Sequence, residues 1–234
     1  MLSRYYRRAD DRPSFLLDLF DGAAGYYDRL CGVMSFGSGQ WYRGWVLQRA
    51  GLRHGMKLLD VATGTALVAR AAATVVNEPR AIVGVDPSGG MLREARKRFS
   101  GPLARGRVEA LPFRDRSFDV VSIGYALRHA ADLDVAFREC LRVLKPGGRL
   151  VVLEISRPPS RAMQTAIRLY LTRVLPFVIR TAHARLLMHY YWETIDTCVP
   201  PETILAVLRR SGFVDVQRTT HAGLQTEYLA AKAA

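Results

Sequence analysis

Residues 62–66, Ala-Thr-Gly-Thr-Ala, form a loop of small side chains between the apolar run Met56–Val61 and the alanine-rich stretch Leu67–Val76. Small residues let a ligand approach the backbone closely, and a helix N-terminus favours negative charge. A strand, such a loop and a helix open a unit that binds nucleotide-like cofactors at the carboxyl ends of strands. The alternative is an ordinary tight turn. The glycine patterns of dinucleotide and phosphate loops are absent here.

A carboxylate, Asp86, follows the next apolar run, Ala81–Val85, and precedes Pro87 and Ser88. An acid at the end of the second strand can accept hydrogen bonds from both hydroxyls of a ribose. The alternative role is the N-cap of the helix that follows. Together with the first loop, Asp86 predicts a ribose site.

Arg128 and His129 follow a third apolar run, Phe118–Ile123, at the end where doubly wound folds bind substrates. A guanidinium beside a phenol favours the phenolate, and an unperturbed histidine, with a pKa near 6.5, can take up the proton. The alternative is that Arg128 pairs with a carboxylate and His129 only packs. The other candidates for acid–base work are Tyr27, His189 and His221.

Apolar runs alternate with amphipathic stretches, so these residues require a parallel sheet covered by helices on both faces, an α/β doubly wound fold. The expected strands are 56–61, 81–85, 118–123 and 149–155, and the expected helices are 67–76, 89–99 and 132–143. A further helix over 201–211 and a hairpin of 214–220 with 225–232 would close the sheet edge. Helices broken near Gly32 and residues 37–39 are expected over 14–50.

The segment from Ile155 to Trp192 contains six arginines and no acidic residue. Apolar residues recur at helical spacing from Met163 to Val174, and Pro176 is expected to end that pattern. One interpretation is a helix lying on an anionic bilayer with its apolar face down. The other is a lid packed on the domain with solvated arginines, and both can hold together.

These boundaries predict a loose basic arm over 1–13 and a single domain over 14–234. Within the domain, residues 14–50 form N-terminal helices, 51–157 the cofactor-binding core, 158–200 a basic lid-like insertion, and 201–234 the closing helix and strands. The net charge of +13 favours an anionic partner, which can be nucleic acid, a membrane surface or a ligand. No metal-ligand spacing occurs among the three cysteines, so we expect no metal and reduced thiols. No leader or spanning segment is recognised, and we expect a cytoplasmic protein, free or bound peripherally at the inner face of the membrane.

Four motifs together resemble class I S-adenosylmethionine-dependent methyltransferases: residues 58–66, Val83–Ser88, Val108–Phe113 with Ser117–Asp119, and Leu144–Leu150. The stretches Phe20–Asp28, Met34–Gly37 with Trp41, and Gly124–His129 are similar to the ubiquinone/menaquinone C-methyltransferase (UbiE/MenG-like) family. The resemblance covers roughly residues 18–232 and is strongest over 55–157. It implies a Rossmann-like sheet of seven strands, the last of them antiparallel, and S-adenosylmethionine as cofactor.

The resemblance also assigns cofactor contacts. It places Asp60, Gly64 and Thr65 at the methionine end, Asp86 at the ribose, Arg107 and Val108 at the adenine edge, and Gly124 at another contact; the neighbours Ala62 and Pro87 complete the expected site. Three residues depart from the family: Ala66 replaces a second glycine, Gly124 stands where serine is frequent, and Arg107 replaces an Asp or Asn. A guanidinium has only donors, so it cannot accept from the adenine amino group.

The expected activity is methylation of a small, lipid-soluble acceptor, and in particular C-methylation of a quinone-like aromatic ring. In that reaction Arg128, His129 and Tyr27 are the expected catalytic residues. The alternatives are an N- or O-methyltransferase of a phospholipid head group or secondary metabolite, a nucleic-acid-directed methyltransferase, and a non-catalytic cofactor-binding protein. No Asn-Pro-Pro-Tyr/Phe motif or RNA-binding module supports a nucleic-acid target.

Overall fold

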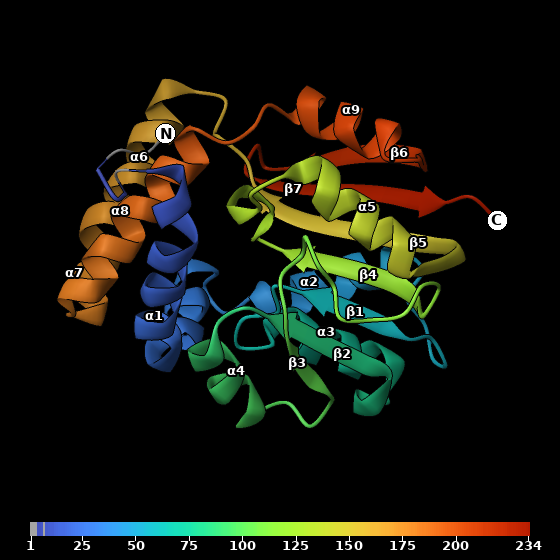
Figure 1. Ribbon diagram of the computed structural model, residues 1–234. Coiled ribbons are helices and arrows are strands. Elements are labelled where there is room, and N and C mark those ends of the chain that lie inside the picture. The colour runs from blue at the N-terminus through green and yellow to red at the C-terminus, as the bar shows by residue number, and fades with distance from the viewer. Residues whose placement is uncertain (1–3, 7) are drawn as a thin grey trace.

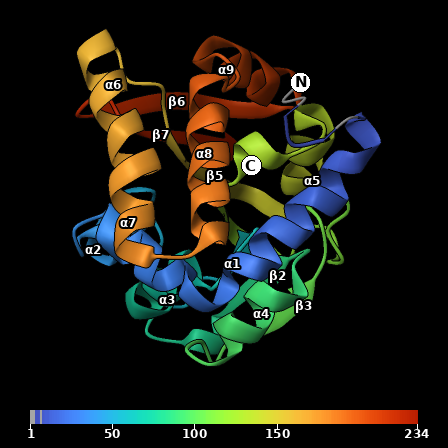
Figure 2. The ribbon, with the colours of Figure 1, turned by 90° about the vertical axis from the view of Figure 1, so that its left-hand side faces the viewer.

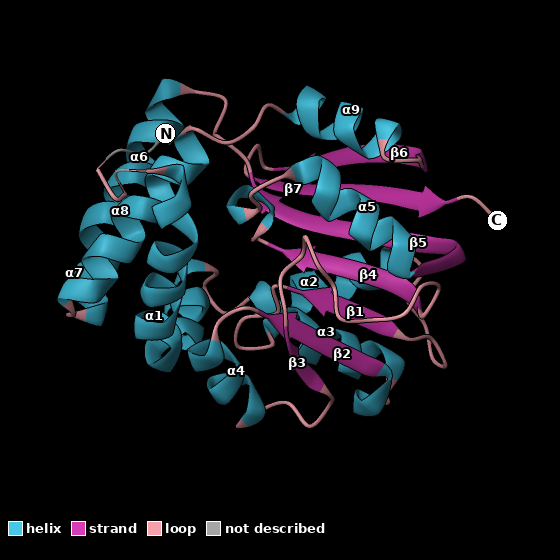
Figure 3. Ribbon diagram, viewed as in Figure 1, coloured by secondary structure: helices cyan, strands magenta, loops and turns pink. Residues whose placement is uncertain are grey.

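The computed structural model describes residues 4–6 and 8–234 and shows one seven-stranded sheet between helices (Figures 1 and 3). The strand order is β3-β2-β1-β4-β5-β7-β6, and β7 alone runs against its neighbours. The predicted fold, with its antiparallel last strand, is therefore confirmed. The strands are β1 (Leu58–Val61), β2 (Ile82–Asp86), β3 (Leu103–Arg105), β4 (Phe118–Gly124), β5 (Leu144–Ile155), β6 (Phe213–His221) and β7 (Gln225–Lys232).

Both faces of the central strands are buried, which explains their continuous apolar runs. Leu59 on β1 packs toward α5 (Leu133–Val143) and α9 (Pro201–Arg210), whereas Leu58 points to the other face. That second face is covered by α2 (Gly39–Arg49), α3 (Leu67–Val76) and α4 (Gly89–Arg96). Each fully buried leucine contributes about 1.5–3 kcal/mol relative to exposure.

A separate group of helices caps the carboxyl ends of the strands (Figure 2). It consists of α1 (Arg12–Met34), α6 (Arg161–Leu169), the π-helical stretch η4 (Tyr170–Val174), α7 (Leu175–Ile179) and α8 (Ala182–Asp196). Their apolar faces form a cluster of their own, which includes Leu19, Leu175 and Tyr190. The acid-free segment is thus a packed helical cap over the end of the sheet that holds the predicted site.

Several local predictions need correction. The first helix continues through Gly32 and ends at Met34. Pro176 does not end the helical segment, because the chain passes through η4 and begins α7, and proline is tolerated in a first helical turn. The strand β3 was not predicted as a residue range, since its three residues have no buried alternation to reveal them.

The predicted arm is docked where the structure describes it; residues 1–3 and 7 lie outside the described chain. A short 3₁₀ turn, η1 (Ala9–Asp11), leads into α1. Tyr5 packs its ring against Phe15 and Tyr190, with ring centroids 5.6 and 5.2 Å apart, and Arg4 pairs with Glu193. Aromatic packing that composition alone does not reveal therefore fixes this part of the chain to the cap.

Candidate active site

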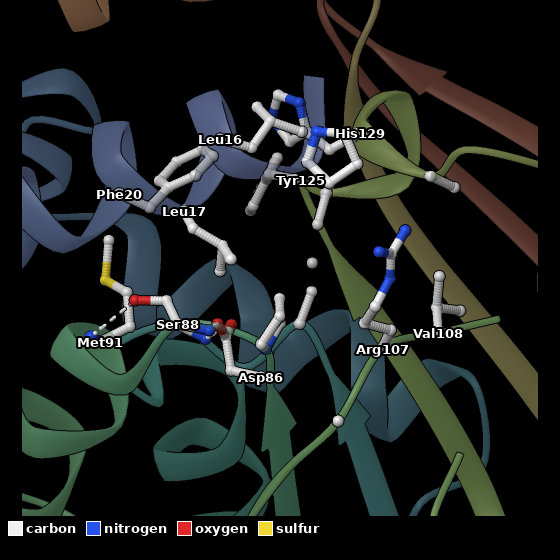
Figure 4. Close-up of a pocket in the computed structure, with 18 of the residues that line it drawn as sticks. Leu16, Leu17, Phe20, Asp86, Ser88, Met91, Arg107, Val108, Tyr125 and His129 are labelled. Carbon is white, nitrogen blue, oxygen red and sulfur yellow. Dashed lines mark hydrogen bonds between the residues drawn. The ribbon is translucent and has the colours of Figure 1, made fainter. Parts of the chain in front are cut away.

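A cavity of about 170 Å³ lies at the carboxyl ends of β1, β2 and β4, beneath α1 (Figure 4). Leu16, Leu17 and Phe20 of α1 form one wall, and Met91 of α4 closes a side. Nine residues predicted from the sequence line it: Tyr27, Ala62, Gly64, Asp86, Pro87, Arg107, Val108, Gly124 and His129. Segments up to about a hundred residues apart in the chain thus converge at one crevice.

Three residues of the first loop have an unusual backbone conformation. Ala62, Gly64 and Ala66 all have left-handed backbone angles, with φ of +53°, +57° and +66°. A side-chain carbon at Gly64 would meet open space in the cavity rather than protein. The two alanines adopt this conformation at some cost in strain, because their Cβ atoms disfavour it.

Asp60 shapes this loop from beneath instead of lining the cavity. Its carboxylate accepts hydrogen bonds from the Thr63 hydroxyl (2.6 Å), the Ser122 hydroxyl (2.7 Å) and the Ala69 backbone N–H (3.1 Å). Burial raises the pKa of Asp60 to about 6, against the lowering effect of these donors. Asp60 therefore positions the loop, and its predicted contact with the cofactor is not part of this geometry.

Asp86 ends β2 and faces the cavity. It accepts the backbone N–H groups of Gly64 and Ser88, each at 2.8 Å. A carboxylate offers about four acceptor positions, so two remain for a diol. The N-cap of α4 is Ser88, which accepts from the Met91 N–H, and this removes the alternative role for Asp86. The residues present therefore fit the ribose of S-adenosylmethionine.

Two carboxylates of α1 that sequence reasoning missed tie the cap to the cofactor loops. Asp21 accepts the Ser88 hydroxyl and the Gly90 N–H, and Asp28 accepts the Thr65 hydroxyl and an Arg70 N–H. The predicted Thr65 thus faces Asp28 and a second cavity, not the first one. Both aspartates lie in the motif Phe20–Asp28, so the similarity of that stretch to the family was a sequence signal that could have identified them.

The second cavity, of about 530 Å³, adjoins the first. The two share Tyr27, Ala62, Gly64, Gly124 and Tyr125, so they meet above the ends of β1 and β4. The junction is tight at Gly124, because a side-chain carbon there would lie 2.6 Å from a Val68 methyl group, which would have to move. The rest of the lining is largely apolar and aromatic and includes Met34, Ile167, Tyr170, Leu171 and Tyr191.

Arg128 lies behind the junction and makes the ion pair that was its alternative role. Its Nη1 donates to Glu154, both side chains are buried, and the guanidinium carbon is 4.3 Å from the centroid of the Tyr191 ring. It lines a separate cavity of about 270 Å³, together with Glu154 and Tyr228. The structure therefore brings Arg128 close to the site without placing it on either of the two joined cavities.

His129 packs between aromatic rings at the rim of the first cavity. It stacks on Tyr190 with centroids 5.8 Å apart and meets Phe20 edge-on at 5.3 Å. Burial, and then the positive charges of Arg128 and Arg12, lower the pKa of His129 well below 6.5. The ring is therefore neutral near pH 7 and a weaker base than the unperturbed value implies.

The remaining acid–base candidates are of different kinds. Burial raises the pKa of Tyr27 well above 10, so its phenol stays protonated and can donate. His221 bonds to Glu227 at 2.7 Å and borders the second cavity. His189 is exposed on α8, away from both cavities. Arg107 forms an ion pair with Glu109, with 3.4 Å between Nε and a carboxylate oxygen.

The affinity for S-adenosylhomocysteine should fall on acidification, because Asp86 must be ionised to accept the ribose hydroxyls. Burial raises its pKa to about 6, so the charged fraction shrinks as the pH falls below that value. Between about pH 7 and about pH 5 calorimetry should show a roughly tenfold loss. Asp86→Asn, which cannot ionise, should bind more weakly at pH 7 and respond less to pH. A flat profile for the unmodified protein would remove Asp86 from the ribose site.

Among the described residues, no group of three or more His, Cys, Asp or Glu side chains is arranged to hold a metal ion. No described helix has the length and apolar character needed to cross a bilayer. Cys31, Cys140 and Cys198 are unpaired, and Cys140 is buried.

Comparison with known proteins extends these findings. The ubiE/COQ5 methyltransferase family matches residues 8–232. A Shewanella woodyi relative is 32% identical over 222 residues, covering 90% of this chain and 87% of its own, and one from Shewanella sp. strain ANA-3 is 33% identical with the same coverage. Both are named ubiquinone/menaquinone biosynthesis C-methyltransferase UbiE.

Solved structures share the fold at lower identity. A Thermotoga maritima S-adenosylmethionine-dependent methyltransferase, described as a possible histamine N-methyltransferase, has a TM-score of 0.63 at 18% identity and covers 92% of this chain and 99% of its own. Phosphoethanolamine N-methyltransferase 2 of Haemonchus contortus, with S-adenosylhomocysteine bound, has a TM-score of 0.65 at 17% identity and covers 97% and 60%. These structures share the fold, and the family match together with the two UbiE relatives makes this chain an S-adenosylmethionine-dependent methyltransferase that belongs to the ubiE/COQ5 methyltransferase family.

Proposed function

We propose that this enzyme methylates a ring carbon of a quinol that carries a lipid tail. The observation that carries the proposal is the second cavity, which is large, mostly apolar and joined to the cofactor cavity at Gly64 and Gly124. A ring seated at the junction would face the methyl end of the cofactor, and the apolar remainder would take the tail. The names of the relatives support the same acceptor class.

The cavity lining favours this acceptor over an amine. Among the described residues that line the second cavity there is no aspartate or glutamate, so a cationic head-group nitrogen would find no counter-charge. Burying such a charge without a partner is costly. The phosphoethanolamine enzyme shares only the fold, and N-methylation remains the second candidate. O-methylation of the same ring is separated from C-methylation by the position of the new methyl group.

S-adenosylmethionine supplies a methyl group on a sulfonium. In the reaction the acceptor hydroxyl would lose a proton, and the ring carbon would take the methyl group as the bond between that group and sulfur breaks. The hydrogen on that carbon would then leave as a proton and the ring oxygen would take one proton back, so that one proton is released per methyl group transferred. Asp86 and the Gly64 loop hold the cofactor, with Ala62, Pro87, Val108 and Gly124 as walls. Arg107 contributes hydrogen-bond donors at the adenine edge. These donors can bond to the ring nitrogens of adenine, which accept, but not to its amino group, which donates.

The three proposed catalytic residues act in different ways. Tyr27 lines both cavities and donates its hydroxyl proton to the acceptor oxygen as a hydrogen bond. His129 is neutral and packed at the rim of the cofactor cavity, where it helps to position the acceptor. Arg128 is a positioning residue, because its charge reaches the site through Tyr27 and Tyr191, whose phenol pKa values it lowers against burial.

Lipid analysis tests the proposed acceptor. A strain in which this gene is deleted should lose one quinone species and accumulate another that is lighter by one methyl group, as measured by mass spectrometry of lipid extracts. Restoring the intact gene should reverse the change, whereas a gene encoding Asp86→Ala should not. Unchanged quinones with an altered phospholipid pattern would favour the N-methyltransferase.

The cap presents the features of a surface that binds an anionic membrane. Five arginines of the acid-free segment form no ion pair with any described residue, and five large apolar side chains of the same helices are exposed. The arginines are Arg161, Arg168, Arg173, Arg180 and Arg185, and the apolar residues are Leu169, Val174, Phe177, Val178 and Leu186. Phe36 and Trp41 border the second cavity and are 87% and 70% exposed. An acceptor with a lipid tail could enter the second cavity there directly from a bilayer. The net positive charge of the protein does not by itself imply this route, because it would also suit a nucleic-acid partner.

Binding to liposomes that contain anionic lipid should be strong at low salt and weaken as salt rises, because screening shortens to about 8 Å near physiological strength. Replacing Arg161 and Arg168 by glutamine should weaken binding by about 1 kcal/mol per charge in a sedimentation assay. Arg80 and Arg114 lie before β2 and β4, at the opposite end of the sheet, and their replacement is the matched control. Equal binding to neutral liposomes would contradict the proposal that the cap binds an anionic membrane. An equal loss of binding on replacing Arg80 and Arg114 would contradict it as well.

A further inference from the structure

A buried arginine without a partner faces the second cavity. Arg43 of α2 is 7% exposed, and its side chain lines the cavity beside Tyr27 and Tyr125. Its guanidinium carbon is 5.3 Å from the centroid of the Tyr125 ring. Among the described residues, no hydrogen bond or ion pair is formed by this guanidinium, and its Nε is fully buried without an acceptor.

The other buried or partly buried arginines nearby each have a carboxylate as counter-charge, although Arg128 and Arg70 also keep buried N–H groups that no described residue accepts. Arg128 pairs with Glu154, Arg70 with Asp28 at 3.0 Å, and Arg49 with Glu227 at 2.9 Å. A buried charge without a counter-charge is strongly unfavourable, so proteins seldom retain one that has no use. Arg43 therefore differs from its neighbours in that it lines the second cavity and has no counter-charge among the described residues.

The backbone makes room for this arrangement. Gly39, one turn earlier on α2, has no side chain, and a carbon there would lie 2.6 Å from Nη1 of Arg43. The positive charge also acts on the junction of the two cavities, since it lowers the pKa values of Tyr27, Cys31 and Tyr125 against the effect of burial. A guanidinium held in this position would act on a bound ligand in the same way.

We propose that Arg43 binds the acceptor's ring oxygen in its anionic, phenolate form, an inference that rests on the proposed function and deepens it. A charge-assisted hydrogen bond in an apolar cavity stabilises the phenolate relative to the neutral phenol. The acceptor then ionises without a strong protein base, which matches the weak basicity of His129. The site would therefore select rings with an ionisable hydroxyl and reject the corresponding methyl ethers.

The test uses 4-nitrophenol as a probe, because its phenolate absorbs visible light. With S-adenosylhomocysteine present, the unmodified protein should bind the phenolate form and lower the apparent pKa of the bound probe. Arg43→Met should weaken phenolate binding roughly 10- to 100-fold and abolish the pKa shift, whereas Arg43→Lys should retain part of both. Arg29→Met removes an exposed cation from α1 that pairs with no residue in the described part of the chain; it is the control and should change neither.

Two further measurements separate this role from a structural one. Arg43→Met should keep its affinity for S-adenosylhomocysteine and melt no earlier than the unmodified protein, because it removes an unpaired buried charge. With a quinol acceptor, the acidic limb of kcat/KM should move to higher pH in that variant.

Phenolate binding that is unchanged in Arg43→Met, or absent from the unmodified protein, would overturn the inference. A protein that binds the phenolate through Arg43 but methylates no quinol would instead refute the proposed function and leave the anion site standing. If Arg43→Met failed to fold, the same comparison would be made with Arg43→Lys, and full loss of the pKa shift despite its retained charge would count against the inference.

Discussion

Gly64→Val should abolish cofactor binding while the fold survives. Gly64 has φ of +57°, which a β-branched residue adopts only with strain of about 1–3 kcal/mol, and the new side chain would project into the cofactor cavity. A shift of this loop would also break the hydrogen bond from the Gly64 N–H to Asp86. Loss of the ribose contact alone costs about 1.5–3 kcal/mol, which is roughly a 10- to 150-fold fall in affinity, and the side chain inside the cofactor cavity weakens binding further.

Gly147→Val provides the matched control for this experiment. Gly147 has φ of +71°, a side-chain carbon there would also meet open space, and it lies in the turn at the start of β5, away from both cavities. The two variants should lose comparable stability in thermal melts, but only Gly64→Val should lose S-adenosylhomocysteine binding in calorimetry. Tight binding by Gly64→Val would mean that the cofactor does not pass over this loop.

Arg128→Met should destabilise the fold by about 3–5 kcal/mol, because it leaves the buried carboxylate of Glu154 without its cation. Chemical denaturation would show a lower midpoint. Arg210→Met, which opens the exposed pair with Asp134, should change stability little. A small loss in Arg128→Met would contradict the burial of this pair.

The double variant Arg128→Met/Glu154→Leu should recover most of that stability, because both charges are removed together. It also separates two roles for Arg128. If the arginine serves only as the partner of Glu154, activity should return with stability. If its charge tunes Tyr27 and Tyr191, kcat should remain low in the refolded double variant while S-adenosylhomocysteine affinity is normal.

Contiguous motifs made part of the site predictable from the sequence. Gly64 and Asp86 follow directly from strand ends, and the alternation of strands and helices predicts that they meet at one edge of the sheet. Asp60 was placed in the cofactor site by resemblance, yet its buried carboxylate accepts hydrogen bonds from Thr63, Ala69 and Ser122 and does not line the first cavity. Such satisfaction depends on a hydroxyl 62 residues away on β4 and has no signature in the local sequence.

The other properties of the site depend on contacts between residues far apart in the sequence, so the sequence alone did not predict them. The partner of Arg128 is Glu154, at the end of the neighbouring strand β5, and only the pairing of β4 with β5 brings the two together. The lowered pKa of His129 arises first from burial, then from its sequence neighbour Arg128, and then from Arg12, which is 117 residues earlier in the chain. Arg43 carried no motif of its own, because its importance lies in the absence of a partner in a cavity built by the cap.

A labelled methyl group shows directly whether this methyltransferase forms a bond between that group and a ring carbon of a quinol. The purified protein would be given S-adenosylmethionine with a deuterated methyl group and a reduced demethylated naphthoquinone with a short prenyl tail. We expect one labelled methyl group per product molecule, bonded to a ring carbon, as shown by mass spectrometry and by deuterium NMR at the aryl-methyl position. Label on the ring oxygen, or transfer to phosphoethanolamine with none to the quinol, would contradict it.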